Sequence, residues 1–136
     1  MGRSRLAENV CGEQVRVALM EARPAGLTIP QLTAATGLTP YQVRKGLLFI
    51  REVGAMAHLT PLTWSRASGY AFADDPAVWL AYTMAVLRAE LTRVNRLITA
   101  TIAPCAQSYP HDEDIAIVMG QINGVQATLR ALTRAR

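Results

Sequence analysis

The sequence predicts a mainly helical α+β chain in two parts, and three observations support this. Residues 28–54 have the pattern of two short helices joined by a tight turn. Residues 55–73 change to short extended segments around a further turn, which is typical of a β-hairpin. Residues 74–136 then carry two long apolar repeats with coiled-coil spacing. We therefore expect one small domain over residues 1–73 and a C-terminal two-helix coiled-coil hairpin over residues 74–136.

The composition indicates a globular protein. The chain has 136 residues, about one domain in length, and 51% of them are hydrophobic, which suffices for a core without disulfides or metals. No apolar run approaches the roughly 18 to 20 residues that a membrane-spanning helix needs. The N-terminus, MGRSRLAENV, lacks the apolar segment of a secretory signal. We therefore expect a cytoplasmic protein with no membrane partner.

Reactive side chains are few and scattered. Cys11, Cys105, His58 and His111 have no neighbouring metal ligands. We expect both cysteines to be free thiols, with a disulfide or a redox switch at Cys105 as the less favoured alternative. The chain also lacks a Gly-rich phosphate loop and a nucleophile elbow, and its acids do not converge. We therefore expect no catalytic residues, no metal site, no cofactor and no enzyme activity.

Apolar residues at helical spacing predict a first helix over residues 5–22. Residues 23–26, Arg-Pro-Ala-Gly, end this helix because proline and glycine disfavour its continuation. Leu27–Ile29 is predicted to form a short strand. A second helix follows from about Pro30 to Thr36, and its predicted inward-facing residues are Leu32 and Ala35.

A third helix is predicted from about Pro40 to Val53, with its end at Gly54. Gly37 can adopt the left-handed conformation that ends the preceding helix. Thr39 is a suitable N-cap before a proline at the first helical position. The apolar stripe of this helix has spacings of four and three and consists of Val43, Leu47 and Ile50.

The pattern then changes from helical to extended. Residues 55–60 are expected to be extended. Tyr70 and Phe72 alternate with small residues, which predicts a half-buried strand. Residues 65–69 are predicted to form the turn before this strand, with Arg66 at its tip.

The positive charge is concentrated in the first part of the chain. Residues 1–73 hold eight Arg or Lys and four Asp or Glu, whereas residues 74–136 hold six of each. The formal net charge of +4 therefore lies entirely in the first part. Such an asymmetry is expected when a nucleic-acid-binding part is joined to a neutral part.

The order helix, short strand, helix, turn, helix, hairpin resembles the winged helix-turn-helix fold of bacterial transcription regulators, including the MarR-like and PadR-like groups. The resemblance covers roughly residues 5–73 and rests on the hairpin together with Leu32, Ala35, Gly37, Leu38, Thr39, Val43, Leu47, Ile50 and Gly54. It points to the superfamily and to no single family within it. It implies that the third helix binds double-stranded DNA and that the hairpin is the wing, where Arg66 is the only basic residue.

The candidate DNA-binding residues are Thr39, Tyr41, Gln42, Arg44, Lys45 and Arg66. Arginine and glutamine can each pair with a base through two hydrogen bonds, and lysine suits a phosphate. The alternative is an ordinary solvated surface, with Thr39 only an N-cap and Tyr41 packed on the turn. Arg3 and Arg5 are a further candidate, as a basic arm on the DNA, and terminal disorder is the alternative.

Two long helices are predicted in the second part. Asp75 is a candidate N-cap before Pro76, and the first helix should reach about Ile102, where Pro104 breaks it. The second helix should start near Asp112–Asp114, where acidic residues favour a helix N-terminus.

Both helices carry a heptad seam, which predicts dimerisation. The seam of the first helix consists of Leu80, Met84, Leu87, Leu91, Val94 and Ile98. The seam of the second consists of Ile115, Val118, Ile122, Val125, Leu129 and Leu132. Further apolar residues widen these faces, namely Trp79, Tyr82, Val86, Leu97 and Ile117. We therefore expect a homodimer with a four-helix arrangement, and packing on the first part of the same chain is the alternative.

Together these expectations predict a dimeric, sequence-specific DNA-binding transcription regulator of the nucleoid, a repressor in preference to an activator. Helix 39–51 would enter the major groove of each half of a palindromic operator. The alternatives are a plasmid or phage protein for DNA replication, partition or excision, and a winged-helix adaptor that binds another protein. An effector pocket lined by Trp64, Trp79 and Tyr82 is a further hypothesis, and burial of these aromatic residues in a core is favoured over it.

Overall fold

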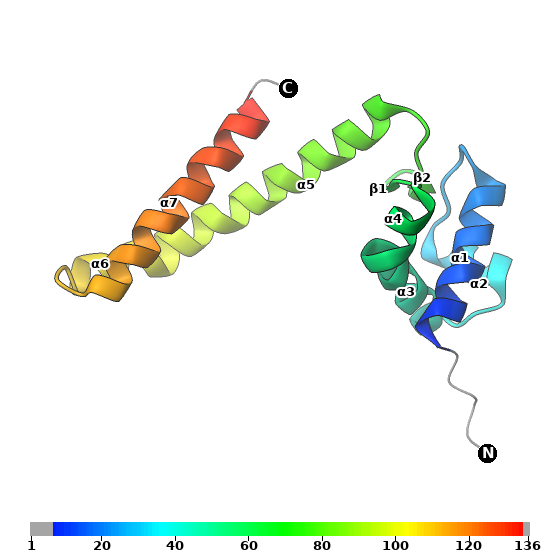
Figure 1. The fold of residues 1–136 in the computed structure, drawn as a ribbon, viewed down its shortest axis with the longest axis horizontal. Helices are drawn as coiled ribbons and strands as arrows, with labels where there is room; N and C mark the ends of the chain where they lie inside the picture. Colours follow the sequence, from blue (N-terminus) through cyan, green and yellow to red (C-terminus); the bar gives the residue numbers. More distant parts are fainter. Residues whose placement is uncertain (1–6, 135–136) are drawn as a thin grey trace, which may run out of the picture. The chain divides into compact units, whose positions relative to one another are not determined.

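The computed structural model describes residues 7–134, and the chain divides into two compact units that meet between Tyr82 and Thr83. The first unit contains, in order, α1 (Glu8–Ala22), α2 (Ile29–Thr36), α3 (Pro40–Phe49), the π-helical turn η1 (Ile50–Gly54), α4 (Ala55–His58), β1 (Leu62–Ser65) and β2 (Gly69–Phe72). Helix α5 (Pro76–Leu97) crosses the division, and the second unit is completed by η2 (Ile98–Ile102), α6 (Ala103–Ser108) and α7 (Glu113–Arg134) (Figure 1). The expected mainly helical chain with a small antiparallel hairpin is confirmed.

A single apolar core holds the first unit together. Helix α1 packs most extensively against α3 and also contacts α2 and β2. The buried residues of this core come from four helical segments, the α2–α3 turn and the hairpin: Cys11, Val15, Ala18, Leu19, Leu32, Leu38, Val43, Leu47, Ile50 and Phe72. Since the apolar stripes of α1, α2 and α3 converge here, the polar side of each helix is left to face outward.

The approach of α1 to α3 depends on a glycine. A Cβ atom added to Gly46 would lie 2.7 Å from the carbonyl oxygen of Cys11, closer than side-chain carbons come to backbone oxygens. Gly46 lies on the buried side of α3, between Val43 and Leu47. Glycine therefore allows the backbones of the two helices to approach each other closely at this point.

Two capping boxes begin α2 and α3. In each box the threonine hydroxyl accepts a hydrogen bond from the backbone N–H of the glutamine three residues later. The side-chain oxygen of that glutamine in turn accepts one from the backbone N–H of the threonine. The pairs are Thr28 with Gln31, at 3.3 and 2.9 Å, and Thr39 with Gln42, at 3.2 and 3.0 Å. Between them Gly37 ends α2 at φ 72°, in the left-handed conformation that the sequence predicts.

The hairpin pairs β1 with β2 in antiparallel register, so that Trp64 lies opposite Tyr70. Its turn spans residues 66–68. Phe72 is buried in the core and Tyr70 is half-buried, which confirms the predicted strand. The core therefore anchors the base of the hairpin, while its turn is exposed.

Two smaller predictions for this region are wrong. Leu27–Ile29 is no strand, because Thr28 caps α2 and only Leu27 forms a β-bridge, with Tyr70. Ala35 does not face inward, because it is exposed on α2 while Leu32 fills the core. The helix α2 begins at Ile29, one residue earlier than predicted, and of the two predicted inward residues only Leu32 is buried.

The third helix is longer than the sequence predicts. Its predicted end at Gly54 and the predicted extended conformation of residues 55–60 are both wrong, because the chain stays helical through η1 and α4. Gly54 keeps a right-handed backbone at φ −66°, and Leu59 takes the left-handed conformation at φ 52° instead. The amides of Leu59 and Thr60 then donate to carbonyl groups of α4, which satisfies the helix end.

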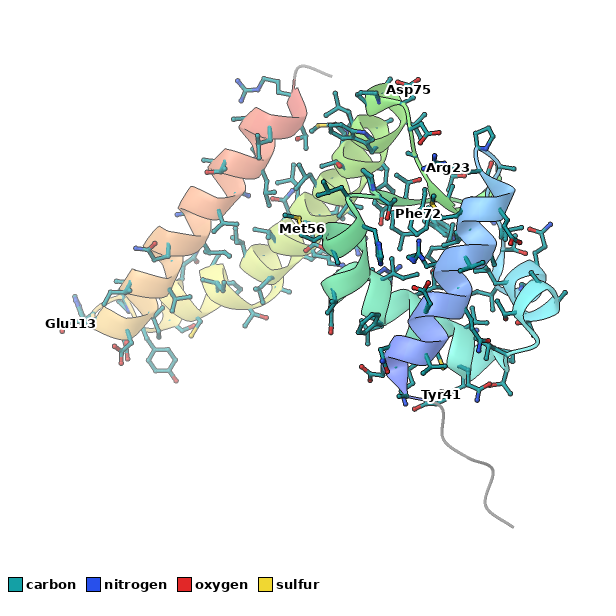
Figure 2. The ribbon with its side chains drawn as sticks, turned by 45° about the vertical axis from the view of Figure 1, so that its right-hand side comes forward. Arg23, Tyr41, Met56, Phe72, Asp75 and Glu113 are labelled. Atoms are coloured by element: carbon teal, nitrogen blue, oxygen red, sulfur yellow. The ribbon has the colours of Figure 1, made fainter. Side chains whose placement is uncertain are left out.

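Asp75 caps α5, as the sequence predicts, and Asp112 caps α7, which begins where the sequence predicts. The Asp75 carboxylate accepts a hydrogen bond from the N–H of Ala77 at 2.9 Å, and that of Asp112 accepts one from Ile115 at 3.1 Å. Figure 2 labels Asp75 and Glu113 at these two helix starts. Aspartate at these positions satisfies free amides and complements the positive end of each helix dipole.

The predicted helix break at Pro104 is wrong. The chain remains helical from α5 through η2 and α6 to Ser108. Pro104 is the second residue of α6, directly after the π-helical turn η2. The hydrogen-bond register changes in that turn, so the missing N–H of a proline is tolerated there.

Neither α5 nor α7 contains a fully buried residue. Their half-buried seam residues are Leu80, Met84, Leu87, Leu91 and Val94 on α5 and Ile115, Ile122 and Leu129 on α7, while Ile98 in η2 is buried. The other seam residues of α7, Val118, Val125 and Leu132, are 46% to 51% exposed. In a single chain the α7 seam is therefore divided between a half-buried side and an exposed side.

A side-chain hydrogen bond joins α5 and α7 at a half-buried position. The side-chain amide of Gln126 donates to the side-chain oxygen of Asn95 at 2.6 Å. A polar pair between apolar helix faces favours one alignment of the two helices, because any shift would leave both groups unpaired.

Residues 7–134 contain neither a candidate membrane span nor a cluster of metal ligands. No helix in this range combines the length and the apolar character needed to cross a bilayer. No group of three or more His, Cys, Asp or Glu in the same range is placed to hold a metal ion. Cys11, in the core, and Cys105, half-buried in α6, are both free thiols.

Thr60 offers a direct test of the core. Its hydroxyl is buried without a hydrogen-bond partner, whereas the buried hydroxyl of Thr63 donates to the carbonyl of Ala71 at 3.3 Å. We predict that Thr60→Val raises the free energy of unfolding by about 1 kcal/mol, since valine has the same shape and needs no partner. Thr63→Val should lower it by about 1 kcal/mol in the same urea titration. A loss of stability in Thr60→Val would contradict this account.

Candidate nucleic-acid interface

The outward side of the third helix carries a continuous set of exposed residues, which we call the basic face. Tyr41, Arg44, Leu48 and Arg51 follow one another at spacings of three, four and three, and all are exposed. Lys45 borders them and is half-buried. The buried side of the same helix holds Val43, Gly46, Leu47 and Ile50. The burial of one side against the core therefore determines that the basic face points outward.

Thr39 and Gln42 have a structural role at the start of this face. Both side chains are engaged in the capping box of α3. The amide oxygen of Gln42 already accepts the N–H of Thr39, so its amide nitrogen is the group left for a ligand. The Thr39 hydroxyl accepts one hydrogen bond and keeps its own proton to donate. The sequence T-x-x-Q at both helix starts was the signal for these boxes.

The cations of the basic face are not neutralised by acids. Among residues 7–134 no ion pair involves Arg44, Lys45, Arg51 or Arg66, whereas Arg23 pairs with Asp74 at 3.1 Å. Arg66 lies on a different element, at the exposed turn of the hairpin. The structure thus places Tyr41, Arg44 and Lys45 together on one helix, and Arg66 at the tip of the hairpin, as the sequence predicts.

Arg51 belongs to the basic face although it is not among the predicted residues. Its guanidinium lies over the ring of Tyr70 at 5.6 Å from the ring centre, and its Nη2 lies 3.5 Å from the Tyr70 hydroxyl. This cation–π contact links η1 to β2, and so ties the helix to the hairpin. The spacing of seven residues from Arg44 was the sequence signal for its position.

Leu48 is also outside the predicted set. It is 44% exposed at the centre of the basic face, between Arg44 and Arg51. A single exposed leucine is common on a helix surface, so Leu48 by itself does not indicate a partner, but it adds an apolar side chain to the centre of the basic face. Tyr41, labelled in Figure 2, is 72% exposed and extends the apolar part of the surface toward the start of α3.

A pocket in the first unit lies apart from the basic face, since no residue of that face lines it. It is a shallow hollow of about 550 Å³ beside α1 and α2, lined by Glu13, Val17, Glu21, Leu27 and Ala35 among others. A hydrogen bond from Arg16 lowers the pKa of Glu13. None of the aromatic residues proposed for an effector pocket lines it.

Those aromatic residues do not form a core either. Trp64 and Trp79 are 47% and 38% exposed, so the prediction that they are buried is wrong for the single chain. Tyr82 is half-buried. The proposed basic arm, Arg3 and Arg5, lies outside the described residues.

The chain matches no protein-family model, no curated protein and no solved structure. The interpretation of the basic face therefore depends on its own geometry and charge.

Substitution of Gln42 separates capping from any other role of this residue. Glutamate also completes a capping box, so we predict that Gln42→Glu changes the free energy of unfolding by less than about 0.5 kcal/mol. Gln42→Ala should lower it by roughly 0.5 to 1 kcal/mol, because one N–H at the helix start loses its partner. Gln31→Ala, at the matching position of α2, is the control and should behave alike. Equal losses in both Gln42 variants, measured by urea denaturation, would show that the box is not formed.

Proposed function

We propose that this protein is a dimeric, sequence-specific DNA-binding transcription regulator with a winged helix-turn-helix domain. In this proposal α2, the Gly37 turn and α3 are the helix-turn-helix, and β1 and β2 are the wing. The protein represses by occupying a palindromic operator near a promoter.

The basic face is the observation that carries the proposal. Arg44, Lys45 and Arg51 are presented without acidic partners on the outer side of a helix whose other side is fixed in a core. A phosphate backbone supplies the missing counter-charge, and its displaced counterions make association favourable. An adaptor that binds proteins would be expected to present fewer charges at the centre of its contact surface.

The helix has the dimensions for the major groove. From Pro40 to His58 it is about 28 Å long, and a single α-helix fits the groove width of about 12 Å. Arg44 is positioned to pair with guanine, and Leu48 to contact a thymine methyl group. Lys45 and Arg51 suit the flanking phosphates. The start of α3 adds the Thr39 hydroxyl and the positive end of a helix dipole, both of which favour a phosphate.

In this proposal the wing contributes Arg66 directly, and it holds Arg51 of η1 through Tyr70. Arg51 is held by Tyr70 of β2, so the helix and the hairpin act as one rigid surface. Arg66, at the exposed turn, suits the phosphates or the minor groove beside the bound helix.

Dimerisation is supported by the lack of buried residues in α5 and α7. Two 22-residue helices that bury no side chain completely have not formed a core of their own. A second copy would cover the apolar side chains that remain exposed, among them Val86, Leu97, Val118, Val125 and Leu132. A two-fold dimer presents two copies of α3, which would select an operator with two-fold symmetry.

The basic face predicts how substitutions change DNA binding. Arg44→Ala and Lys45→Ala should each weaken binding to a selected duplex about fivefold or more, and lower the slope of log affinity against log salt by about 0.9 per lost phosphate contact. Fluorescence anisotropy between 50 and 300 mM salt measures both quantities.

The matched control is Arg130→Ala, which removes one positive charge from α7, far from the basic face in sequence. It should leave affinity and salt slope unchanged. Equal effects of all three substitutions would mean that net charge, and not the basic face, determines binding. Binding of the wild type that is weak and independent of salt would favour the adaptor function.

A further inference from the structure

Helix α5 carries a strip of side chains that stay at least 40% exposed in the second unit. Within residues 83–97, Val86 is 40% and Leu97 is 47% exposed, and the side chains of Glu90 and Arg93 are 46% and 74% exposed. Successive residues of a helix are about 100° apart, which places these four within a narrow strip. This strip, Val86, Glu90, Arg93 and Leu97, is distinct from the half-buried seam of the same helix.

The strip is symmetric along the helix. Its residues are spaced four, three and four apart, in the order apolar, acidic, basic and apolar along the helix. Val86 and Leu97 are equally distant from the point between Leu91 and Thr92, and so are Glu90 and Arg93. A two-fold axis at that point would therefore bring each residue opposite one of complementary chemistry on an antiparallel copy.

The ion pair in the strip supports a second copy as the occupant. Arg93 Nη1 lies 3.1 Å from Glu90 Oε1 within the helix. In an antiparallel pair, Glu90 would meet Arg93 of the other copy as well, which joins four alternating charges into one network at the centre. In a parallel pair, like charges would lie opposite each other, which is unfavourable.

We infer that α5 pairs with α5 of a second copy in antiparallel orientation, about a two-fold axis between Leu91 and Thr92. Val86 then packs on Leu97 at both ends, and Glu90 and Arg93 form the central network. The inference rests on the proposed dimer and adds its orientation and its contact residues. Heptad spacing alone is compatible with either orientation of the helices.

Disulfide trapping in the full-length chain tests the orientation directly. The variants are Val86→Cys and Leu97→Cys, each with Cys105→Ser, while the native Cys11 stays buried in the core. In the inferred pair, the two copies of residue 86 are about 16 Å apart along the helix, too far for a disulfide, whereas residues 86 and 97 are opposite. A mixture of the two variants should give a cross-linked dimer under mild oxidation, and neither variant alone should.

Charge reversal provides a second measurement, by sedimentation equilibrium. Glu90→Arg and Arg93→Glu should each raise the dimer dissociation constant about tenfold, and the double variant should return to within about threefold of the wild type. The control is Glu13→Arg, which breaks the i,i+3 pair of Glu13 with Arg16 on α1 and should leave the dissociation constant unchanged.

Each outcome is informative. Cross-linking of Val86→Cys with itself, or no rescue in the double charge variant, would overturn the inference while the dimer stands. A wild type that is monomeric at every concentration would overturn both the inference and the dimer. DNA binding measured on the same samples reports separately on the regulator function, since the basic face lies in the other unit.

Discussion

The packing of α3 against α1 is the constraint on which the rest of the first unit depends. Val43, Leu47 and Ile50 are 0% to 2% exposed, and burial of side chains of this size contributes about 2 kcal/mol each. This contact is possible at such short range because Gly46 has no side chain. Because Val43, Leu47 and Ile50 are buried, the side chains of Arg44, Leu48 and Arg51 on the opposite side of the helix point outward. The charge pattern that we associate with DNA is thus a consequence of core packing.

The second unit, unlike the first, has no fully buried residues on its two long helices. Its two long helices are well capped and aligned by the Asn95–Gln126 hydrogen bond, yet neither buries a residue completely. A helix hairpin with uncovered apolar side chains gains stability from association, so folding and dimerisation would be coupled. In the proposed regulator this coupling matters, because the second copy doubles the DNA contacts and a palindromic operator rewards both at once.

Sequence patterns predicted the core and the placement of the candidate residues on the fold better than the limits of the helices. The stripe of Val43, Leu47 and Ile50 was sufficient to orient α3, since the side of a helix that is buried follows directly from apolar spacing. Its end was not predictable from Gly54, because glycine permits a left-handed turn without requiring one, and Leu59 adopts it instead. Pro104 likewise permits a helix to continue when a π-helical turn precedes it. Arg51 and Leu48 could have been found from their spacing, whereas the contact of Arg51 with Tyr70 depends on the tertiary fold.

The central claim is that the basic face recognises a specific DNA sequence, and selection from a random pool of duplex DNA tests it most directly. The protein is bound to the pool at moderate salt, bound duplexes are amplified and sequenced, and the affinity of the enriched sequences is followed against salt. The account predicts a palindromic motif with half-sites about one helical turn apart, nanomolar affinity and a steep salt slope. Recovery of no common sequence, with weak binding that salt does not change, would contradict it.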